Sequence, residues 1–256
     1  MGTRIFASQD GGACFEAQPA QLPELMADES ARVWVSLDQQ GPQHLRILTD
    51  VMQLHPLLVE DALDVAPTPK AEDHGDYTYL ILHGLRHRAF EGKDEKDVPG
   101  AAGKVETVDV DFFIGERFLI THHRLPMPSL EAVRGAVMKD DELLAKGPAY
   151  VAHALIDHMI DAYQPMMERL DREVVRVERA ALEDPDPKLL ESIFAPKHAL
   201  QGLRRVGIHQ REILRGLATR RFRRIPEGIE PFCNFQRQIL AGFGDRSTDV
   251  FPHAPG

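Results

Sequence analysis

Short runs rich in β-branched and aromatic residues predict strands in the first half of the chain. These runs are residues 33–37, 77–86, 105–114 and 117–123. The last two are separated only by Gly115-Glu116, which predicts a hairpin with a two-residue turn. Such turns need a positive φ, and glycine adopts one without steric cost.

Helical spacing of apolar residues separates these strands. It predicts one helix over residues 43–54, with Leu45, Leu48, Val51 and Leu54 on one face, and another over 56–65 that begins at Pro56. A further short helix should follow Pro128, with Leu130, Val133 and Val137 on one face. The charged, glycine-rich segment 91–104 is typical of a mobile loop.

The second half has the pattern of two long helices. The apolar positions of the first are Ile156, Met159, Tyr163, Met166, Leu170, Val174, Val177 and Ala181. They recur every three or four residues, as in a coiled-coil seam, and residues 184–188 interrupt them. A second run continues from Leu190 to Leu217, so the pair should form an antiparallel hairpin.

Helix length predicts that this hairpin protrudes. A helix from Ala149 to about Glu183 would extend ~50 Å at 1.5 Å per residue, longer than a compact domain needs. Pro165 and Pro196 should kink the two helices, because proline removes a backbone hydrogen bond.

These patterns predict an α/β (α+β) N-terminal domain with a mixed sheet flanked by helices, followed by a long antiparallel helical hairpin. The expected boundaries are residues 1–140 for the α/β domain, 141–232 for the hairpin and 233–256 for a divergent tail that frays.

Composition indicates an ordinary soluble globular protein, with 43% hydrophobic and 27% charged residues. Cys14 and Cys233 lie too far apart in sequence to suggest a metal motif or a disulfide framework, which favours a reducing, cytoplasmic compartment. The N-terminus does not resemble a signal peptide, and no run reaches the roughly 18 apolar residues of a membrane span.

The net charge of −10 is unevenly distributed. Residues 197–224 carry nine Lys or Arg and one acid, Glu212, a balance of +8 that leaves −18 for the rest. An acidic body attracts divalent cations and disfavours nucleic acid, whereas a basic helical end could favour phosphates, an acidic partner or a membrane surface. The simpler interpretation is a solvated basic face that the acidic body neutralises.

The spacing of candidate ligand residues along the chain points most directly to a metal-binding site. His153, Asp157 and Asp161 recur every four residues on one predicted helix, so they could hold a transition metal, and the two carboxylates alone would suit a largely hydrated Mg²⁺. A polar helix stripe is the alternative. The neighbouring His122 and His123 should point to opposite faces of a strand and are not expected to share an ion.

Motifs of common enzymes are absent from the sequence. There is no Gly-x-Ser-x-Gly elbow, no phosphate-binding glycine loop and no His-Glu-x-x-His helix, so we expect no enzyme. Arg220, Arg221, Arg223 and Arg224 around Phe222 form one basic cluster, which is weak support for nucleic-acid binding at a pI near 5.6.

The most specific signal is the succession from Leu54 through His55-Pro56-Leu57 to Val59-Glu60-Asp61-Ala62-Leu63, then Pro69-Lys70-Ala71-Glu72, then Tyr77 and Tyr79. It resembles the signature of the CorA family of Mg²⁺ channels. Further similarity lies in Phe118–His123, Leu155–Asp157, Asp161–Tyr163, Leu203–Arg205, Gln210–Glu212 and Ile225–Phe232, so the resemblance spans about residues 30 to 232.

The resemblance implies a cytoplasmic domain that senses Mg²⁺ through acidic residues between the protomers of a pentamer. Co²⁺ or another divalent cation is the alternative ligand. Binding would be weak and regulatory, with Asp157 and Asp161 matching an acidic pair on the first long helix. Its partners would be copies of itself rather than nucleic acid. It would meet the membrane, at the inner face of the plasma membrane, only through segments missing from this chain.

The sequence departs from the family after Phe232. Cys233-Asn234-Phe235-Gln236 stands where the family has an acidic start to its stalk helix, and the pore segment is absent, so we expect the chain not to conduct ions itself. The family has a second acidic sensing position, which corresponds to residues near 88–91 of this chain. The alternatives are the cytoplasmic domain of a ZntB-type zinc transporter, in which histidines would matter, and a metal-dependent hydrolase.

Overall fold

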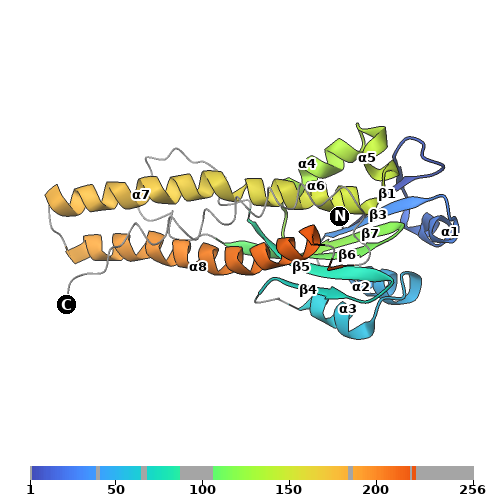
Figure 1. Ribbon diagram of the computed structural model, residues 1–256, viewed down its shortest axis with the longest axis horizontal. Coiled ribbons are helices and arrows are strands. Elements are labelled where there is room, and N and C mark those ends of the chain that lie inside the picture. Colours follow the sequence, from blue (N-terminus) through green and yellow to red (C-terminus); the bar gives the residue numbers. More distant parts are fainter. Residues whose placement is uncertain are drawn as a thin grey trace.

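The computed structural model describes residues 2–38, 41–64, 68–86, 106–183, 187–219 and 221–222. Its centre is a mixed sheet of seven strands in the order β2-β1-β3-β7-β6-β5-β4, with helices on both faces (Figure 1). The strands are β1 (Thr3–Ser8), β2 (Phe15–Ala17), β3 (Arg32–Asp38), β4 (Lys70–Asp73), β5 (Tyr77–Leu85), β6 (Thr107–Gly115) and β7 (Phe118–His123). The four predicted strands are confirmed as β3, β5, β6 and β7.

Strand β3 joins the two halves of the sheet. It pairs with β7 in parallel and with β1 antiparallel, and every other pairing is antiparallel. The sequence analysis did not predict β1, β2 or β4, although Ile5, Phe6 and Ala7 of β1 are fully buried. Three to six residues carry too little periodicity to be identified without their pairing partners.

The predicted hairpin between β6 and β7 forms, but the reason given for Gly115 was wrong. Gly115 ends β6 and is not among the residues with positive φ, and the connection follows the pair Ile114–Leu119. A Cβ at residue 115 would lie only 2.3 Å from Cε1 of Phe118. The Phe118 ring packs against this backbone, so a side chain at residue 115 would force the ring to shift.

One layer of short helices covers the first face of the sheet. It contains the 3₁₀ helix η1 (Pro19–Gln21), α1 (Leu22–Ala27), α2 (Pro42–Arg46), the π-helical turn η2 (Ile47–Val51) and α3 (Pro56–Leu63). Pro56 begins α3 as predicted, because the first helical residue needs no N–H partner. Leu45 was wrongly placed on the buried face: it is 48% exposed, while Ile47 is buried, since the wider η2 turn rotates the apolar face.

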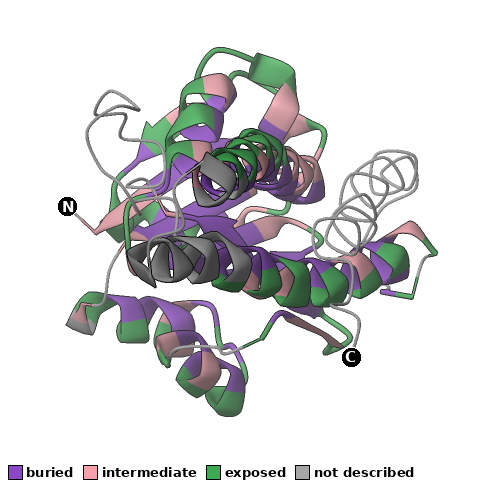
Figure 2. Cartoon of the chain, turned by 90° about the vertical axis from the view of Figure 1, so that its left-hand side faces the viewer, coloured by how far each residue is buried: buried purple, intermediate pink, exposed green. Residues whose placement is uncertain are grey.

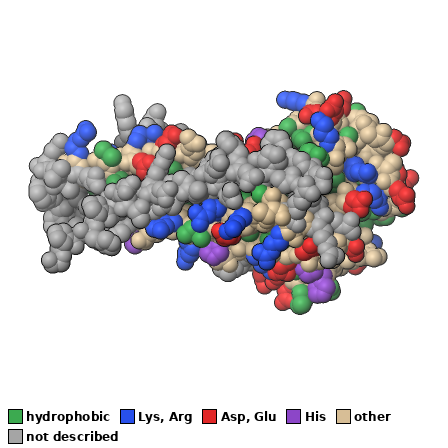
Figure 3. All heavy atoms as spheres, viewed as in Figure 1, with side chains coloured by type: hydrophobic (Ala, Val, Ile, Leu, Met, Phe, Trp, Pro, Cys, Tyr) green, Lys and Arg blue, Asp and Glu red, His purple; other side chains and the backbone are tan. Residues whose placement is uncertain are grey.

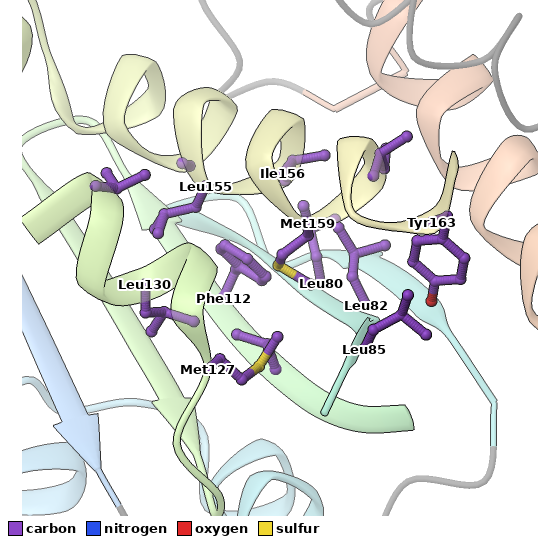
Figure 4. Packing of buried hydrophobic residues seen from close by; sticks show 14 of the residues in the cluster. Leu80, Leu82, Leu85, Phe112, Met127, Leu130, Leu155, Ile156, Met159 and Tyr163 are labelled. Carbon is purple, nitrogen blue, oxygen red and sulfur yellow. The ribbon is translucent and has the colours of Figure 1, made fainter. Parts of the chain in front are cut away.

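The second layer covers the opposite face with α4 (Pro128–Val137), α5 (Asp141–Ala145) and α6 (Pro148–Asp161). Leu130, Val133 and Val137 of α4 are fully buried, which confirms the predicted helix. In Figure 4, Leu155, Ile156 and Met159 of α6 project towards Leu80, Leu82 and Phe112 of the sheet. We call the sheet with its two helical layers the sandwich. Helix α6 belongs to the sandwich and also begins the long helical run that continues into α7.

The hairpin consists of α7 (Tyr163–Glu183) and α8 (Pro187–Ala218), which run antiparallel and project from the sandwich (Figure 1). The run predicted from Ala149 to Glu183 is divided at Ala162. Pro165 explains this break, because it has no N–H to bond the carbonyl of Asp161. The α8 backbone stays helical through Pro196. Figure 2 shows the outer faces of the described helices exposed.

The fold class is thus confirmed: a mixed sheet flanked by helices, followed by a long antiparallel hairpin. The predicted loop 91–104 and tail 233–256 lie outside the described residues. The domain boundary at residue 140 stays a prediction.

Candidate functional site

The acidic pair Asp157 and Asp161 lies on the last turns of α6. The opposite face of α6 is buried in the core through Leu155, Ile156, Met159 and Ile160. Asp157 is partly exposed and Asp161, the last residue of α6, is exposed. Residues four apart share a helix face, so the two carboxylates are neighbours beside the break at Ala162.

The electrostatics of this pair favour a cation. The pKa of the Asp161 carboxyl is raised above its ordinary value, mainly by loss of hydration and secondly by repulsion from Asp157. His158 opposes this shift. One turn earlier, burial lowers the pKa of His153, although Asp157 opposes that shift. Two repelling carboxylates and a neutral imidazole therefore follow one face of α6, and a bound cation would relieve the repulsion.

The number of ligands limits what this site can hold. Within the described part of the chain, no three His, Cys, Asp or Glu side chains are placed to hold a metal ion together. His153, Asp157 and Asp161 thus do not form a three-ligand transition-metal site in one protomer. Mg²⁺ requires less, because it keeps several waters and is commonly bound through one or two carboxylates.

A hydrogen-bonded clamp holds the hairpin to the sheet directly beyond the acidic pair. The Tyr163 hydroxyl donates to the backbone carbonyl of His83 at 2.7 Å, and the His83 backbone N–H donates to Oε1 of Gln210 at 2.6 Å. Tyr163 and Gln210 are both buried. The clamp therefore joins α7, β5 and α8 two residues after Asp161.

His122 and His123 point to opposite faces of the sheet, as predicted. His122 Nδ1 lies 3.2 Å from Asp111 Oδ2, and Asp111 also accepts a hydrogen bond from the Tyr79 hydroxyl at 2.8 Å. On the other face, His123 Nδ1 lies 3.1 Å from the carbonyl of Leu37. Burial raises the pKa of Asp111 and lowers that of His123.

The sequence analysis missed the buried group formed by Tyr79, Asp111 and His122. Its signal was a carboxylate directly before an apolar run, Asp111 before Phe112-Phe113-Ile114. All three side chains are almost completely enclosed, so this group stabilises the sheet rather than meeting a ligand.

Only Arg221 and Phe222 of the cluster considered for nucleic acid lie in the described residues. Phe222 is buried against α8 near Gly216 and is not available for stacking on bases. Arg221 is exposed, whereas Arg220, Arg223 and Arg224 lie outside the described residues. The acidic position expected near residues 88–91 and the divergent stretch 233–236 also lie outside the described residues.

In the described ranges, no helix combines the length and apolar character needed to span a bilayer.

Comparison with known proteins gives one consistent family. The model of the CorA-like Mg²⁺ transporter protein family matches residues 29–234. "Putative metal ion transporter YfjQ" of Bacillus subtilis is 26% identical over 195 residues, 75% of this chain and 56% of that protein. The cobalt/magnesium transport protein CorA of Thermotoga maritima is 25% identical over 190 residues, 71% of this chain and 50% of CorA. The chain thus spans about half the length of these relatives.

Solved structures show the same fold. The soluble domain of CorA from Methanocaldococcus jannaschii superposes with a TM-score of 0.75 at 13% identity, covering 96% of this chain and 91% of that one. The ZntB cytoplasmic domain from Vibrio parahaemolyticus reaches 0.58 at 17% identity, covering 97% and 98%. The family match extends over most of the chain and includes α6 with its acidic pair. This chain therefore belongs to the CorA-like Mg²⁺ transporter family.

Proposed function

We propose that this chain is the cytoplasmic, cation-responsive module of a CorA-like metal ion transport protein, and that it regulates rather than catalyses. The observation that carries the proposal is the Asp157–Asp161 pair, which lies in the family match and at the junction of sandwich and hairpin. We propose Mg²⁺, with Co²⁺ as a related ion, as the weakly bound ligand.

The mechanism follows from the position of the pair. Without a cation, the two carboxylates repel each other at the end of α6. Asp157 and Asp161 would hold a hydrated Mg²⁺, whose charge would offset that repulsion and stabilise the last turn of α6. Because Tyr163 begins α7 directly after this turn and is clamped to β5, a change here reaches the base of the hairpin.

Two carboxylates leave most of the coordination sphere to water or to another molecule. We propose that a second copy of this chain supplies part of it, so that ion binding favours self-association. A ligand can shift such an equilibrium only through a difference in affinity between the two states, and an interfacial ion provides that difference.

Light scattering after size exclusion tests the proposal. In millimolar Mg²⁺ the mass should exceed that in EDTA, and calorimetry should detect weak Mg²⁺ binding. Asp157→Asn with Asp161→Asn should abolish both responses. A matched control, Glu24→Gln with Glu29→Gln, makes the same change in charge on the α1 side of the sheet and should respond like the parent chain.

An identical Mg²⁺ response in the Asp157/Asp161 double variant would refute the site. Equal masses in Mg²⁺ and EDTA, together with no heat of Mg²⁺ binding, would refute the cation-responsive function.

Zinc is the second candidate ion, because His153 lies one turn before Asp157 and its lowered pKa keeps the imidazole neutral, as metal binding requires. The ZntB alternative predicts tighter Zn²⁺ than Mg²⁺ binding that His153→Asn weakens. Unchanged Zn²⁺ affinity in that variant would exclude His153 as a ligand.

A further inference from the structure

A cavity of about 300 Å³ lies between α8 and the adjoining edge of the sheet, and neither Asp157 nor Asp161 lines it. One wall is a single face of α8, and the other is formed by β5, by the start of β6 and by the residues before β4. The polar or basic lining residues are Thr68, His83, Thr107, His198, Arg205 and His209. We call this cavity the α8 groove.

The lining of the α8 groove has the opposite character to the chain as a whole. The chain carries a net charge of −10, yet none of the described residues that line the groove is acidic. Arg205 provides a fixed positive charge, and the threonine hydroxyls can act as hydrogen-bond donors. Figure 3 shows Lys and Arg side chains gathered along α8.

The groove is built by fixed elements rather than by one flexible side chain. His83 is only 6% exposed, and its backbone is held by Tyr163 and Gln210. Nδ1 of His209 lies 2.8 Å from the Arg205 carbonyl and donates to it, which fixes the orientation of this ring on the α8 wall. At Gly202, midway along the α8 wall, an added Cβ would meet no atom within 4 Å, so space for a ligand begins at the helix backbone.

We propose that the α8 groove binds a small phosphate-bearing anion. Without described carboxylates it has no ligands for Mg²⁺, whereas a guanidinium matches the geometry of a phosphate group and can donate two parallel hydrogen bonds to it. The volume is at the lower end of small-molecule sites, which fits inorganic phosphate or a nucleoside phosphate. The function of the acidic pair does not depend on this site.

Calorimetry with the full chain tests the proposal, using inorganic phosphate, pyrophosphate and ADP as probes in EDTA, so that no Mg²⁺ complex forms. Sodium chloride at matched ionic strength serves as the blank. Arg205→Gln should weaken binding at least tenfold. Arg204→Gln makes the same charge change on the neighbouring exposed residue, which does not line the groove, and should bind like the parent chain.

Gly202→Leu provides an independent test that does not depend on charge. The leucine fills the groove from the α8 backbone and also raises helix propensity, so the variant should unfold at a higher temperature and yet lose binding. Loss of binding could then not be attributed to misfolding.

The two sources of phosphate give different results. Equal affinity for phosphate and ADP identifies the ion itself as the ligand, and tighter ADP binding identifies a nucleoside phosphate. The proposal is overturned if no probe binds above the chloride blank, if Arg204→Gln weakens binding as much as Arg205→Gln, or if Gly202→Leu binds normally.

Discussion

The sandwich and the hairpin are stabilised in different ways. The central strands of the sandwich lie between two helical layers, so residues such as Trp34, Tyr79 and Phe112 are completely buried. In the hairpin, α7 buries one stripe, including Leu170, while Val175 beside that stripe is 55% exposed. The sandwich should therefore set global stability, and the hairpin should open locally at lower free energy.

The boundary between the two regions is also where the candidate sites lie. The acidic pair ends α6, the clamp holds the first residue of α7, and the α8 groove is lined by the residue whose backbone the clamp holds, His83. Three predictions test this comparison.

The largest effect should come from the sandwich. Phe112→Ala should lower the free energy of unfolding by about 3–5 kcal/mol, because it removes a fully buried ring and leaves a cavity. Urea unfolding measures the loss. Hydrogen exchange should accelerate in both regions, because α6 links them, whereas Leu170→Ala should accelerate it mainly in α7 and α8. Equal exchange patterns in the two variants would contradict separate stabilisation.

A smaller effect should come from the clamp. Tyr163→Phe removes the hydrogen bond to the His83 carbonyl and should cost about 1–3 kcal/mol, because that buried acceptor loses its hydroxyl donor. Amides at the base of α7 and α8 should exchange faster while those of β6 and β7 change little. Tyr150→Phe, at a partly buried residue of α6, is the matched control. Uniform acceleration across the sheet would show that the clamp belongs to the global core.

The smallest effect should be a pH dependence from the sandwich. Burial lowers the folded-state pKa of His123 below the ~6.5 of an unfolded histidine, so below that pH the unfolded chain binds more protons than the folded one. Stability is therefore lost as pH falls from 7.5 to 5.5, by at most about 1.4 kcal/mol per pH unit for this residue.

Urea unfolding of His123→Asn and the parent chain across that range isolates this contribution. The parent should lose stability more steeply towards acid. Burial raises the pKa of Asp111, which acts with the opposite sign in both proteins, so only the difference between the two slopes is informative. Equal slopes for His123→Asn and the parent would contradict the prediction.

Local patterns along the chain were sufficient for much of this protein. Runs of β-branched and aromatic residues located β3, β5, β6 and β7, and prolines marked the starts of α3 and α4. Apolar spacing identified the seam of the hairpin, and Pro165 predicted an interruption of the first helix, which the structure has at Ala162. The four-residue spacing of Asp157 and Asp161 placed both on one helix face, because a helix fixes that relation locally.

Only the tertiary structure decided the features that join distant segments. The short β1 and β4 are strands because neighbouring strands pair with them, and the Phe118 ring packs on the backbone of Gly115. The α8 groove brings Thr68, His83 and Thr107 to a face of α8 more than 90 residues further along the chain. Periodicity reports only which face of its own element a residue occupies, whereas a cavity depends on how elements pack together.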